Sequence, residues 1–472
     1  MTVRRRSVVG VSRRLSAHGV RRLPVVATAA VTALVLLLAG CDSTGGAEPG
    51  PTLHSGATTF SQKTRLTFGV FGSQDEVTAF QAVVDTFNAS STDSQVSLRS
   101  WTSRKDMMAD LRGGSTAQLP DVFMASRSDL AWLQDKQLTQ PVDELLDERG
   151  VDFGDGYSRD ALEAFSADNR LQCMPYAISP MVIYYNKKLV DFAKMQAHDI
   201  SAPDPASEKP YWTFDQFTAA AEFATRPRKH TRGVYIEPTL SGLAPFIYSG
   251  GGQLFDDEDQ PTSLAFSSDA TRSALQRTLP LLRDPHVTLT RQQLAKAPAL
   301  RWFERGRLGM IAGFRSLVPT LRQVQGLDFD VMPMPSLDGG ATVGDVTGLC
   351  MSADAASTPA AADFLVHALS SESVSRVVRS GYLVPANLEV AASDDFLQPG
   401  RLPDHAAVFN SGVRTLRFAP LVDTLPDLER TVSGKLDELL NVPVLDLDAI
   451  TTKIDQESQP VLDPTAASES PR

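Results

Sequence analysis

Strand patterns and helix patterns alternate along most of this chain, and that alternation restricts the possible fold more than any other feature. Residues 64–70 alternate between apolar and polar side chains, as a strand does. Apolar residues then recur at helical spacing, at Val77, Phe80, Val84 and Phe87. A second alternating segment at 96–99 precedes another helical stretch and the apolar run 119–124. Strands that alternate with helices in this way predict an α/β fold.

Local patterns also predict helix ends and core faces. Thr213 and Gln216 have the spacing of a capping box, in which each side chain bonds the other's free backbone NH. Leu275, Leu279 and Leu282 recur on one face of a helix, which is more typical of a core face than of a ligand site.

The N-terminus has the pattern of an export signal. Seven arginines precede an uncharged apolar run at 25–38, which is shorter than the roughly 20 residues that a membrane-spanning helix needs. The run closes on Leu38-Ala39-Gly40-Cys41, which resembles a bacterial lipobox and predicts lipidation of Cys41 after removal of residues 1–40. The alternative is an ordinary signal peptide with a chance cysteine. Ser12-Arg13-Arg14 hints at a twin-arginine signal, but Ser16 stands where that signal has a hydrophobic residue.

Residues 41–62 are rich in Gly, Pro, Ser and Thr, which predicts a flexible tether, and residues 464–472 are expected to form a disordered tail. Residues 1–40 hold seven of the 45 basic residues and none of the 56 acidic ones, so the mature chain carries a net charge of −18. Such an acidic chain is a poor partner for nucleic acid, which proteins bind through Lys and Arg. The remaining length allows about two or three domains.

Motifs of the common secreted hydrolases are missing from the sequence. There is no Gly-x-Ser-x-Gly elbow, no Ser-x-x-Lys and no His-Glu-x-x-His, and 249–252 lacks the Lys-Ser/Thr of a phosphate loop. The acidic run 256–259 lacks the EF-hand glycine. We therefore expect no enzyme activity, no metal and no cofactor. The paired carboxylates of a glycosidase are the exception to this search, because they are close in the folded protein without a fixed spacing in the sequence.

Ten short motifs, in order along the chain, are similar to those of the carbohydrate-type extracellular solute-binding proteins, relatives of maltose-binding protein. They are 119–123 (Leu-Pro-Asp-Val-Phe), 138–143 (Leu-Thr-Gln-Pro-Val-Asp), 174–176 (Met-Pro-Tyr), 182–187 (Val-Ile-Tyr-Tyr-Asn-Lys), 212–217 (Trp-Thr-Phe-Asp-Gln-Phe), 250–254 (Gly-Gly-Gly-Gln-Leu), 303–310 (Phe-Glu-Arg-Gly-Arg-Leu-Gly-Met), 333–335 (Pro-Met-Pro), 360–365 (Ala-Ala-Ala-Asp-Phe-Leu) and 381–386 (Gly-Tyr-Leu-Val-Pro-Ala). Each motif alone is weak, and their common order carries the resemblance.

The resemblance implies a two-lobed periplasmic-binding-protein fold of type II, in which a hinge joins two lobes that are each a sheet flanked by helices. It implies an N-terminal lobe of residues 63–174 and 349–405 and a C-terminal lobe of residues 178–346 and 406–463. The implied function is a monomeric, lipid-anchored receptor on the outer face of the cytoplasmic membrane. It would bind a carbohydrate between the lobes and deliver it to ABC permease subunits. A sensor or adhesin that uses the same fold is the alternative.

The resemblance also places Cys173 and Cys350, the two cysteines besides Cys41, on neighbouring strands at the hinge. A disulfide there requires Cα atoms within about 7 Å of each other. Two unrelated buried thiols are the alternative. Neither residue has the ligand spacing of a zinc site.

Candidate ligand-binding residues follow predicted strands or lie near the hinge, where backbone and polar side chains can approach a sugar. They are Phe71, Ser73, Trp101, Ser126, Arg127, Tyr176, Ser179, Tyr248, Gly250, Gly251, Phe314, Arg315, Asp345 and Thr347. For each of these residues, the alternative to ligand binding is a solvated position on the surface or a contact between the lobes. Phe314-Arg315 stands where sugar binders of the family have tryptophan, which favours a small sugar, a polyol, an acidic sugar or a decayed pocket over a long oligosaccharide.

Overall fold

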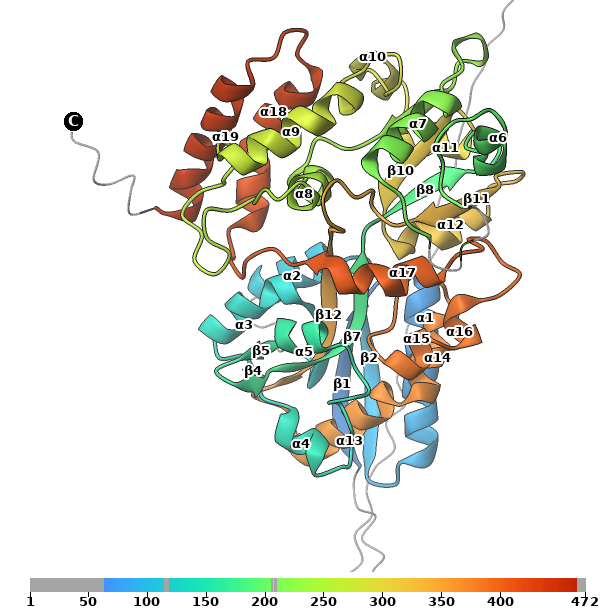
Figure 1. The fold of residues 1–472 in the computed structure, drawn as a ribbon. Coiled ribbons are helices and arrows are strands. Elements are labelled where there is room, and N and C mark those ends of the chain that lie inside the picture. The colour runs from blue at the N-terminus through green and yellow to red at the C-terminus, as the bar shows by residue number, and fades with distance from the viewer. Residues whose placement is uncertain (1–62, 114–118, 205–206, 208–209, 465–472) are drawn as a thin grey trace, which may run out of the picture. The chain divides into compact units, whose positions relative to one another are not determined.

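The computed structural model describes residues 63–113, 119–204, 207 and 210–464. The expected signal peptide, Cys41, the tether and residues 465–472 of the expected tail lie outside the described residues. Within the described part, no helix is long and apolar enough to cross a membrane. The structure has helices and strands in alternation around two main sheets, which confirms the predicted α/β class (Figure 1).

The first lobe is built on a seven-stranded sheet in which the order β13-β12-β3-β1-β2 is extended by β4 and β7, both paired with β12. The strands are β1 (Thr64–Phe71), β2 (Ser94–Trp101), β3 (Val122–Ser126), β4 (Thr139–Gln140), β7 (Cys173–Pro180), β12 (Thr342–Ser352) and β13 (Leu416–Arg417). β1 pairs with β2 and β3 in parallel, and β12 runs antiparallel to β3 and β7. A small separate sheet joins β5 (Ser166–Ala167) and β6 (Arg170–Leu171).

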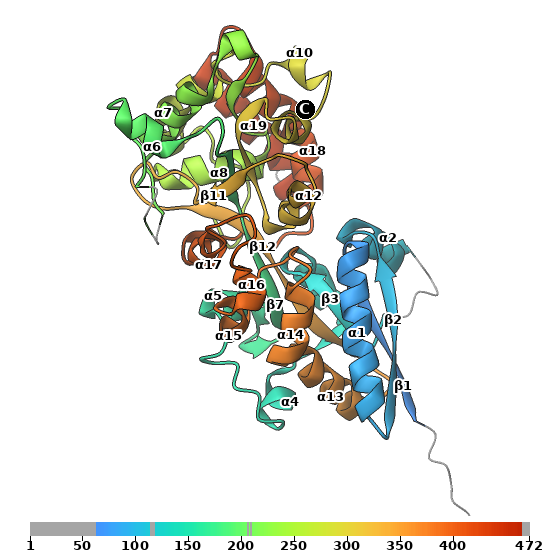
Figure 2. The same ribbon diagram turned by 90° about the vertical axis from the view of Figure 1, so that its right-hand side faces the viewer.

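Helices from the N-terminal part of the chain and from residues 358–397 complete the first lobe (Figure 2). They are α1 (Gln74–Ser90), α2 (Arg104–Gly113), η1 (Arg127–Asp129), α3 (Leu130–Asp135), α4 (Asp143–Asp147), α5 (Arg159–Ala164), α13 (Thr358–Leu369), α14 (Ser371–Val378), α15 (Leu388–Ala391) and α16 (Asp394–Leu397). Phe68 of β1 packs edge-on against Phe80 of α1 and Phe364 of α13, with ring centroids 5.8 and 5.0 Å apart. One apolar core therefore joins segments almost 300 residues apart in the chain.

The second lobe surrounds a four-stranded sheet in the order β11-β8-β10-β9. Its strands are β8 (Val182–Asn186), β9 (Arg232–Tyr235), β10 (Leu308–Gly313) and β11 (Phe329–Met332). The period of two along β8 divides its side chains between two cores, because Val182 and Tyr184 belong to the core shared with the first lobe and Ile183 and Tyr185 to a second core.

Helices cover the second sheet and continue into the C-terminal segment. They are α6 (Phe192–Ala197), α7 (Phe214–Ala224), η2 (Pro227–Lys229), α8 (Leu240–Ser249), α9 (Asp269–Leu282), α10 (Arg291–Leu294), α11 (Ala299–Glu304), η3 (Arg315–Leu317), α12 (Val318–Arg322), α18 (Leu425–Asn441) and α19 (Leu447–Leu462), with α17 (Ala407–Gly412) and η4 (Val413–Thr415) near the boundary between the lobes. The predicted capping box at Thr213 and Gln216 is confirmed at the start of α7. Leu275, Leu279 and Leu282 of α9 are buried in the second core, as predicted.

Two neighbouring strands, β7 and β12, connect the lobes. Cys173 and Cys350 are register partners on these strands and form a disulfide, with Cα atoms 4.2 Å apart, as the resemblance implies. The strands approach closely at Gly344, where a Cβ atom would lie 2.1 Å from the carbonyl oxygen of Ser179. The limits expected for the lobes, at 174, 178, 346 and 349, fall inside these two strands, and the limits themselves stay a prediction.

Candidate functional site

A cavity of about 610 Å³ lies between the lobes. The first lobe lines it with α2 and the residues of η1, the second lobe with α8, and the hinge with β12 around Asp345. The chain from Arg417 to Glu429, which includes the start of α18, supplies a further wall. Its volume is in the range of small-molecule sites, and a cavity between lobes is a frequent place for them.

Four of the fourteen candidate ligand-binding residues line this cavity: Arg127, Tyr248, Phe314 and Asp345. Arg127 comes from η1, Tyr248 from α8, and Phe314 follows β10 directly. These residues bring a cation, two aromatic rings and a carboxyl group to one space. That combination suits a ligand with both hydroxyl groups and apolar faces. Their contact with a ligand stays a prediction.

The other candidates in the first-lobe loops have structural partners outside the cavity. The Ser73 side chain caps α1 in a capping box with Glu76. The indole NH of Trp101 donates to Asp110 (3.0 Å), and the Arg99 guanidinium lies 4.6 Å from its ring centroid. Phe71 is the register partner of Trp101 and packs against the first core. None of these three residues lines the cavity.

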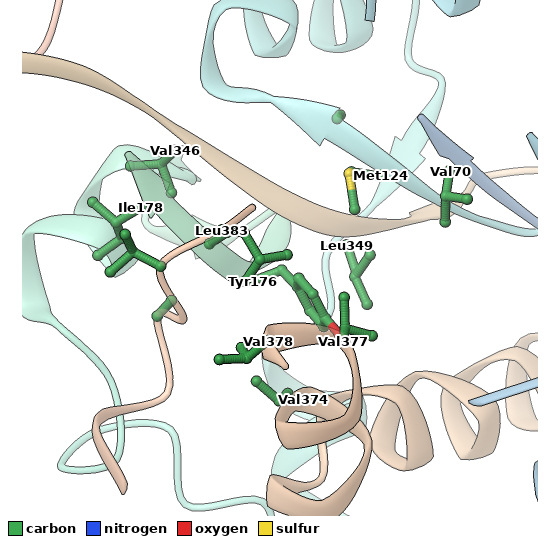
Figure 3. Close-up of a cluster of buried hydrophobic side chains, with 14 of the residues drawn as sticks. Val70, Met124, Tyr176, Ile178, Val346, Leu349, Val374, Val377, Val378 and Leu383 are labelled. Atoms are coloured by element: carbon green, nitrogen blue, oxygen red, sulfur yellow. The ribbon is translucent and has the colours of Figure 1, made fainter. Parts of the chain in front are cut away.

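Tyr176 lies in the interior of the first lobe and is only 2% exposed. Figure 3 shows its ring among the apolar side chains of Val374, Val377 and Leu383. The predicted contact with a ligand would instead require the Tyr176 hydroxyl to face the cavity. Burial raises the pKa of its phenol far above the usual range. Tyr176 therefore serves the core of the first lobe and does not line the cavity.

Arg315 was predicted to contact the ligand, but it does not line the cavity. Its guanidinium is fully buried, and it donates to the carbonyl oxygens of Gly381 (3.2 Å) and Phe396 (3.0 Å) instead of lining the cavity. Phe396 and Phe409 lie on its faces, with centroids 4.6 and 5.1 Å away. The neighbouring Phe314 does face the cavity, so adjacent residues in this loop point to opposite sides.

The remaining candidates also lie outside the cavity lining. Ser179 and Thr347 belong to the paired strands β7 and β12. Gly250 ends α8, where a Cβ atom would lie 2.6 Å from that of Ala274, and Gly251 has a φ of 82° that favours glycine. Their backbone geometry gives both glycines a structural role.

Ser126 lies just behind the cavity wall and organises two charged residues. Its hydroxyl donates to the Asp345 carboxylate, and its backbone NH donates to Asp129 (3.2 Å). Asp129 also receives both prongs of the Arg104 guanidinium, at 2.8 and 2.6 Å. Through these bonds η1 is tied to β12 and α2, so the first-lobe side of the cavity is preorganised.

Arg127 is the cavity residue whose hydrogen bonding is least complete. One of its terminal nitrogens donates to the carbonyl oxygen of Ala419, and its guanidinium lies 5.2 Å from the Phe418 ring centroid. Its Nε atom is buried and has no partner within the described residues. Burial lowers the pKa of Arg127, although nearby Asp345 acts in the opposite direction. A polar ligand atom at Nε would satisfy this donor.

The family of the chain follows from a sequence comparison. A profile described as bacterial extracellular solute-binding protein matches residues 82–403, which is more than half of the chain. The chain belongs to this family. No curated protein sequence matches it.

Solved structures show that this solute-binding protein shares its fold with sugar-binding relatives. The sugar-binding protein MalE from Xanthomonas citri superposes with a TM-score of 0.71 and 14% identity, over 86% of this chain and all (100%) of that one. An ABC substrate-binding protein from Listeria monocytogenes in complex with cycloalternan gives 0.69 and 18%, over 86% and 100%. The cyclic alpha-maltosyl-1,6-maltose binding protein from Arthrobacter globiformis gives 0.68 and 19%, over 85% and 100%. The two-lobed solute-binding fold is confirmed.

Sequence reasoning missed most of the wall that α2 and the chain from 417 to 429 provide. Arg104, Lys105 and Arg112 reach the cavity from one face of α2, and Arg417 and Glu429 from the C-terminal segment. The spacing of the three basic residues on a short helix was visible in the sequence. No local signal indicates that residues 417–429 return to the cavity, because β13 is only two residues long and is held by β12.

A second cavity of about 430 Å³ adjoins the first in this solute-binding protein. Ser241, Phe314 and Glu429 line both cavities, and the second extends between β9, β10 and α11 of the second lobe. Burial raises the pKa of the Glu429 carboxyl. Among the described residues, no group of His, Cys, Asp and Glu side chains could hold a metal ion.

Asp345 allows a test of the electrostatics at the hinge. Burial raises its pKa above the ordinary 3.8, although the Ser126 hydroxyl and Arg104 favour the charged form. A raised pKa adds stability below the unfolded value, and this contribution is lost as the pH rises through the folded value. The variant Asp345→Asn is therefore expected to melt at a higher temperature than wild type near about pH 7, with the difference shrinking toward pH 3.8.

Calorimetric melting temperatures over this pH range measure the effect. Asp147→Asn is a matched control, since Asp147 is exposed on α4. A lower melting temperature for Asp345→Asn near neutral pH would show that the ionised carboxylate is stabilising at this site.

Proposed function

We propose that this protein is a lipid-anchored receptor that binds a carbohydrate, a small sugar or an oligosaccharide, in the cavity between its lobes and delivers it to the permease of an ABC importer. The observation that carries this proposal is the cavity of about 610 Å³ at the junction of the lobes, in a chain of the extracellular solute-binding family. The similar structures named above include proteins described as sugar-binding or in complex with cycloalternan, which supports the ligand class.

The lining of the cavity suits a carbohydrate. Tyr248, Phe314 and Phe418 present aromatic surface, against which the apolar faces of a sugar ring can pack. Arg127 and Lys105 present donors for hydroxyl oxygens, and Asp345 and Glu429 present acceptors. The adjoining second cavity adds room next to Phe314, which favours a ligand with more than one sugar unit over the single small sugar.

The export signal and Cys41 support the anchoring part of the proposal. The tether between Cys41 and the first described strand would keep the receptor near a membrane permease while its lobes move. The test is palmitate labelling of cells that express the chain, with Cys41→Ser as the comparison. Labelling of wild type alone supports the anchor, and equal labelling of both forms contradicts it.

Ligand binding is tested by thermal shift with the full chain in detergent and a panel of neutral and acidic mono- and oligosaccharides. A ligand that binds only the folded chain raises the melting temperature by mass action. We expect a saturable shift with at least one sugar and none with amino acids or dipeptides. A response to amino acids alone, or release of free sugar from a glycoside by the purified protein, contradicts the proposed function.

A further inference from the structure

Three arginines meet where the second lobe adjoins the chain between Gly381 and Arg401. Arg322 of α12 donates from Nη1 to the side-chain oxygen of Gln398 (2.6 Å), and Arg401 donates from Nη1 to that same oxygen (3.3 Å). Arg315 donates from Nε to the carbonyl of Gly381 (3.2 Å), and a Cβ atom on Gly381 would lie 3.4 Å from Nη1 of Arg322. All three guanidinium groups therefore surround Gly381 and Gln398.

This arginine cluster, Arg315, Arg322 and Arg401, has no acidic partner within the described part of the chain. Each hydrogen bond that these three guanidinium groups donate goes to a carbonyl or amide oxygen, and the three cations repel one another. The adjacent Arg379 differs, because Asp395 receives both prongs of its guanidinium at 2.7 and 2.9 Å. In a chain with a net charge of −11, three clustered cations without a carboxylate are an uncompensated positive site.

Two donors of the cluster are buried and unused. Nη1 of Arg315 and Nη2 of Arg322 have no hydrogen-bond partner among the described residues, and the Arg315 side chain is fully buried. A buried charged donor without a partner costs more than one in water. Burial lowers the pKa of both arginines to about 10, so both remain charged near neutral pH. Arg401 is exposed, so the cluster reaches the surface at this residue.

We propose that Arg315, Arg322 and Arg401 bind a small inorganic oxyanion, phosphate or sulfate. The planar fork of a guanidinium matches two oxygens of a tetrahedral oxyanion, and several such forks can share one anion. The anion would lie at the exposed end of the cluster, beside Arg401, and would compensate the repulsion between the cations. A monatomic halide offers no pair of oxygens for the fork, so an oxyanion fits the cluster better.

The anion would hold the lobes together on the side away from the cavity. Arg315 and Arg322 belong to η3 and α12 of the second lobe, and Arg401 follows α16, which packs with α14 on the first lobe. Figure 1 shows α12 and α16 on the opposite side of the hinge strands from α2 and α8. Anion binding is then coupled to lobe position, and by linkage to the affinity of the cavity for its own ligand.

Isothermal titration of sodium sulfate and of sodium phosphate into the full chain in detergent tests the proposal, at an ionic strength kept constant with sodium gluconate. We expect one saturable site for each oxyanion. The exposed variant Arg401→Gln should bind about tenfold more weakly, the loss of one charge-assisted contact. The matched control Arg414→Gln replaces an exposed arginine of η4 and should bind as wild type does.

Three results would overturn the proposal: no saturable binding by wild type, equal affinity in Arg401→Gln and wild type, or chloride that binds as tightly as sulfate. Circular dichroism of each variant establishes that it is folded before titration. The cluster does not line the cavity, so the two tests are independent. A negative oxyanion titration would not contradict the proposed sugar binding, and a negative sugar screen would not contradict the proposed oxyanion site.

Discussion

Replacement of both Cys173 and Cys350 by alanine is expected to lower the free energy of unfolding by about 5 kcal/mol, the loop-entropy value for a cross-link of this span. The disulfide joins residues 177 positions apart, so it removes many extended conformations from the unfolded chain. It also fastens β7 to β12 at the base of the hinge. Urea unfolding followed by circular dichroism measures the difference as a lower transition midpoint.

The same experiment in the presence of a phosphine reductant provides the control. Wild type should become less stable under reducing conditions, while the double alanine variant, which has no disulfide to lose, should not change. If the variant and wild type unfold at the same urea concentration without reductant, the disulfide contributes nothing measurable to the stability of this protein.

Truncation of Tyr248 to alanine is expected to weaken sugar binding about thirtyfold, the effect of losing an aromatic contact worth roughly 2 kcal/mol. Tyr248 comes from the C-terminal end of α8 and lines the cavity with a partly buried ring. Burial raises the pKa of its phenol well above the usual range, so the side chain stays neutral and can pack against a sugar face. Titration calorimetry with the sugar that gives the largest thermal shift measures the affinity.

Tyr211→Ala is the matched control, because Tyr211 lies in the second lobe, is 59% exposed and does not line the cavity. Its affinity should equal that of wild type. If both variants are folded and Tyr248→Ala binds the sugar as tightly as wild type, the sugar does not contact Tyr248 in the first cavity. The second cavity would then be the candidate binding site.

Several features of the fold could be predicted because they depend on local chemistry. The capping box at Thr213 and Gln216 forms as predicted, since both partners lie within one helical turn. The leucine face of α9 is buried, as its helical spacing indicates. The alternation of strands and helices predicted the α/β class, and motifs in the family's order predicted the two lobes.

The site could be predicted only in part. Arg127 and Phe314 were found by the rule that residues next to strand ends approach ligands, Asp345 was found by its place near the hinge, and all three line the cavity. The same rule selected Arg315, whose guanidinium is buried against Phe396 and Phe409. Phe314 and Arg315 are neighbours in the sequence, yet one lines the cavity and the other is buried, because different distant segments pack against them. The spacing of strands in the sequence carries no information about that packing.

The sequence by itself determined the periodic properties of this protein: which segments become strands or helices, where helices begin, and which residues face a core. These properties arise from interactions within a few residues. Only the tertiary structure decided which side chains share the cavity, because Arg127, Asp345 and Glu429 are brought together by strand pairing and helix packing across three hundred residues. It also decided that Arg315, Arg322 and Arg401 meet without a carboxylate, since both lobes must fold before the three charges approach one another.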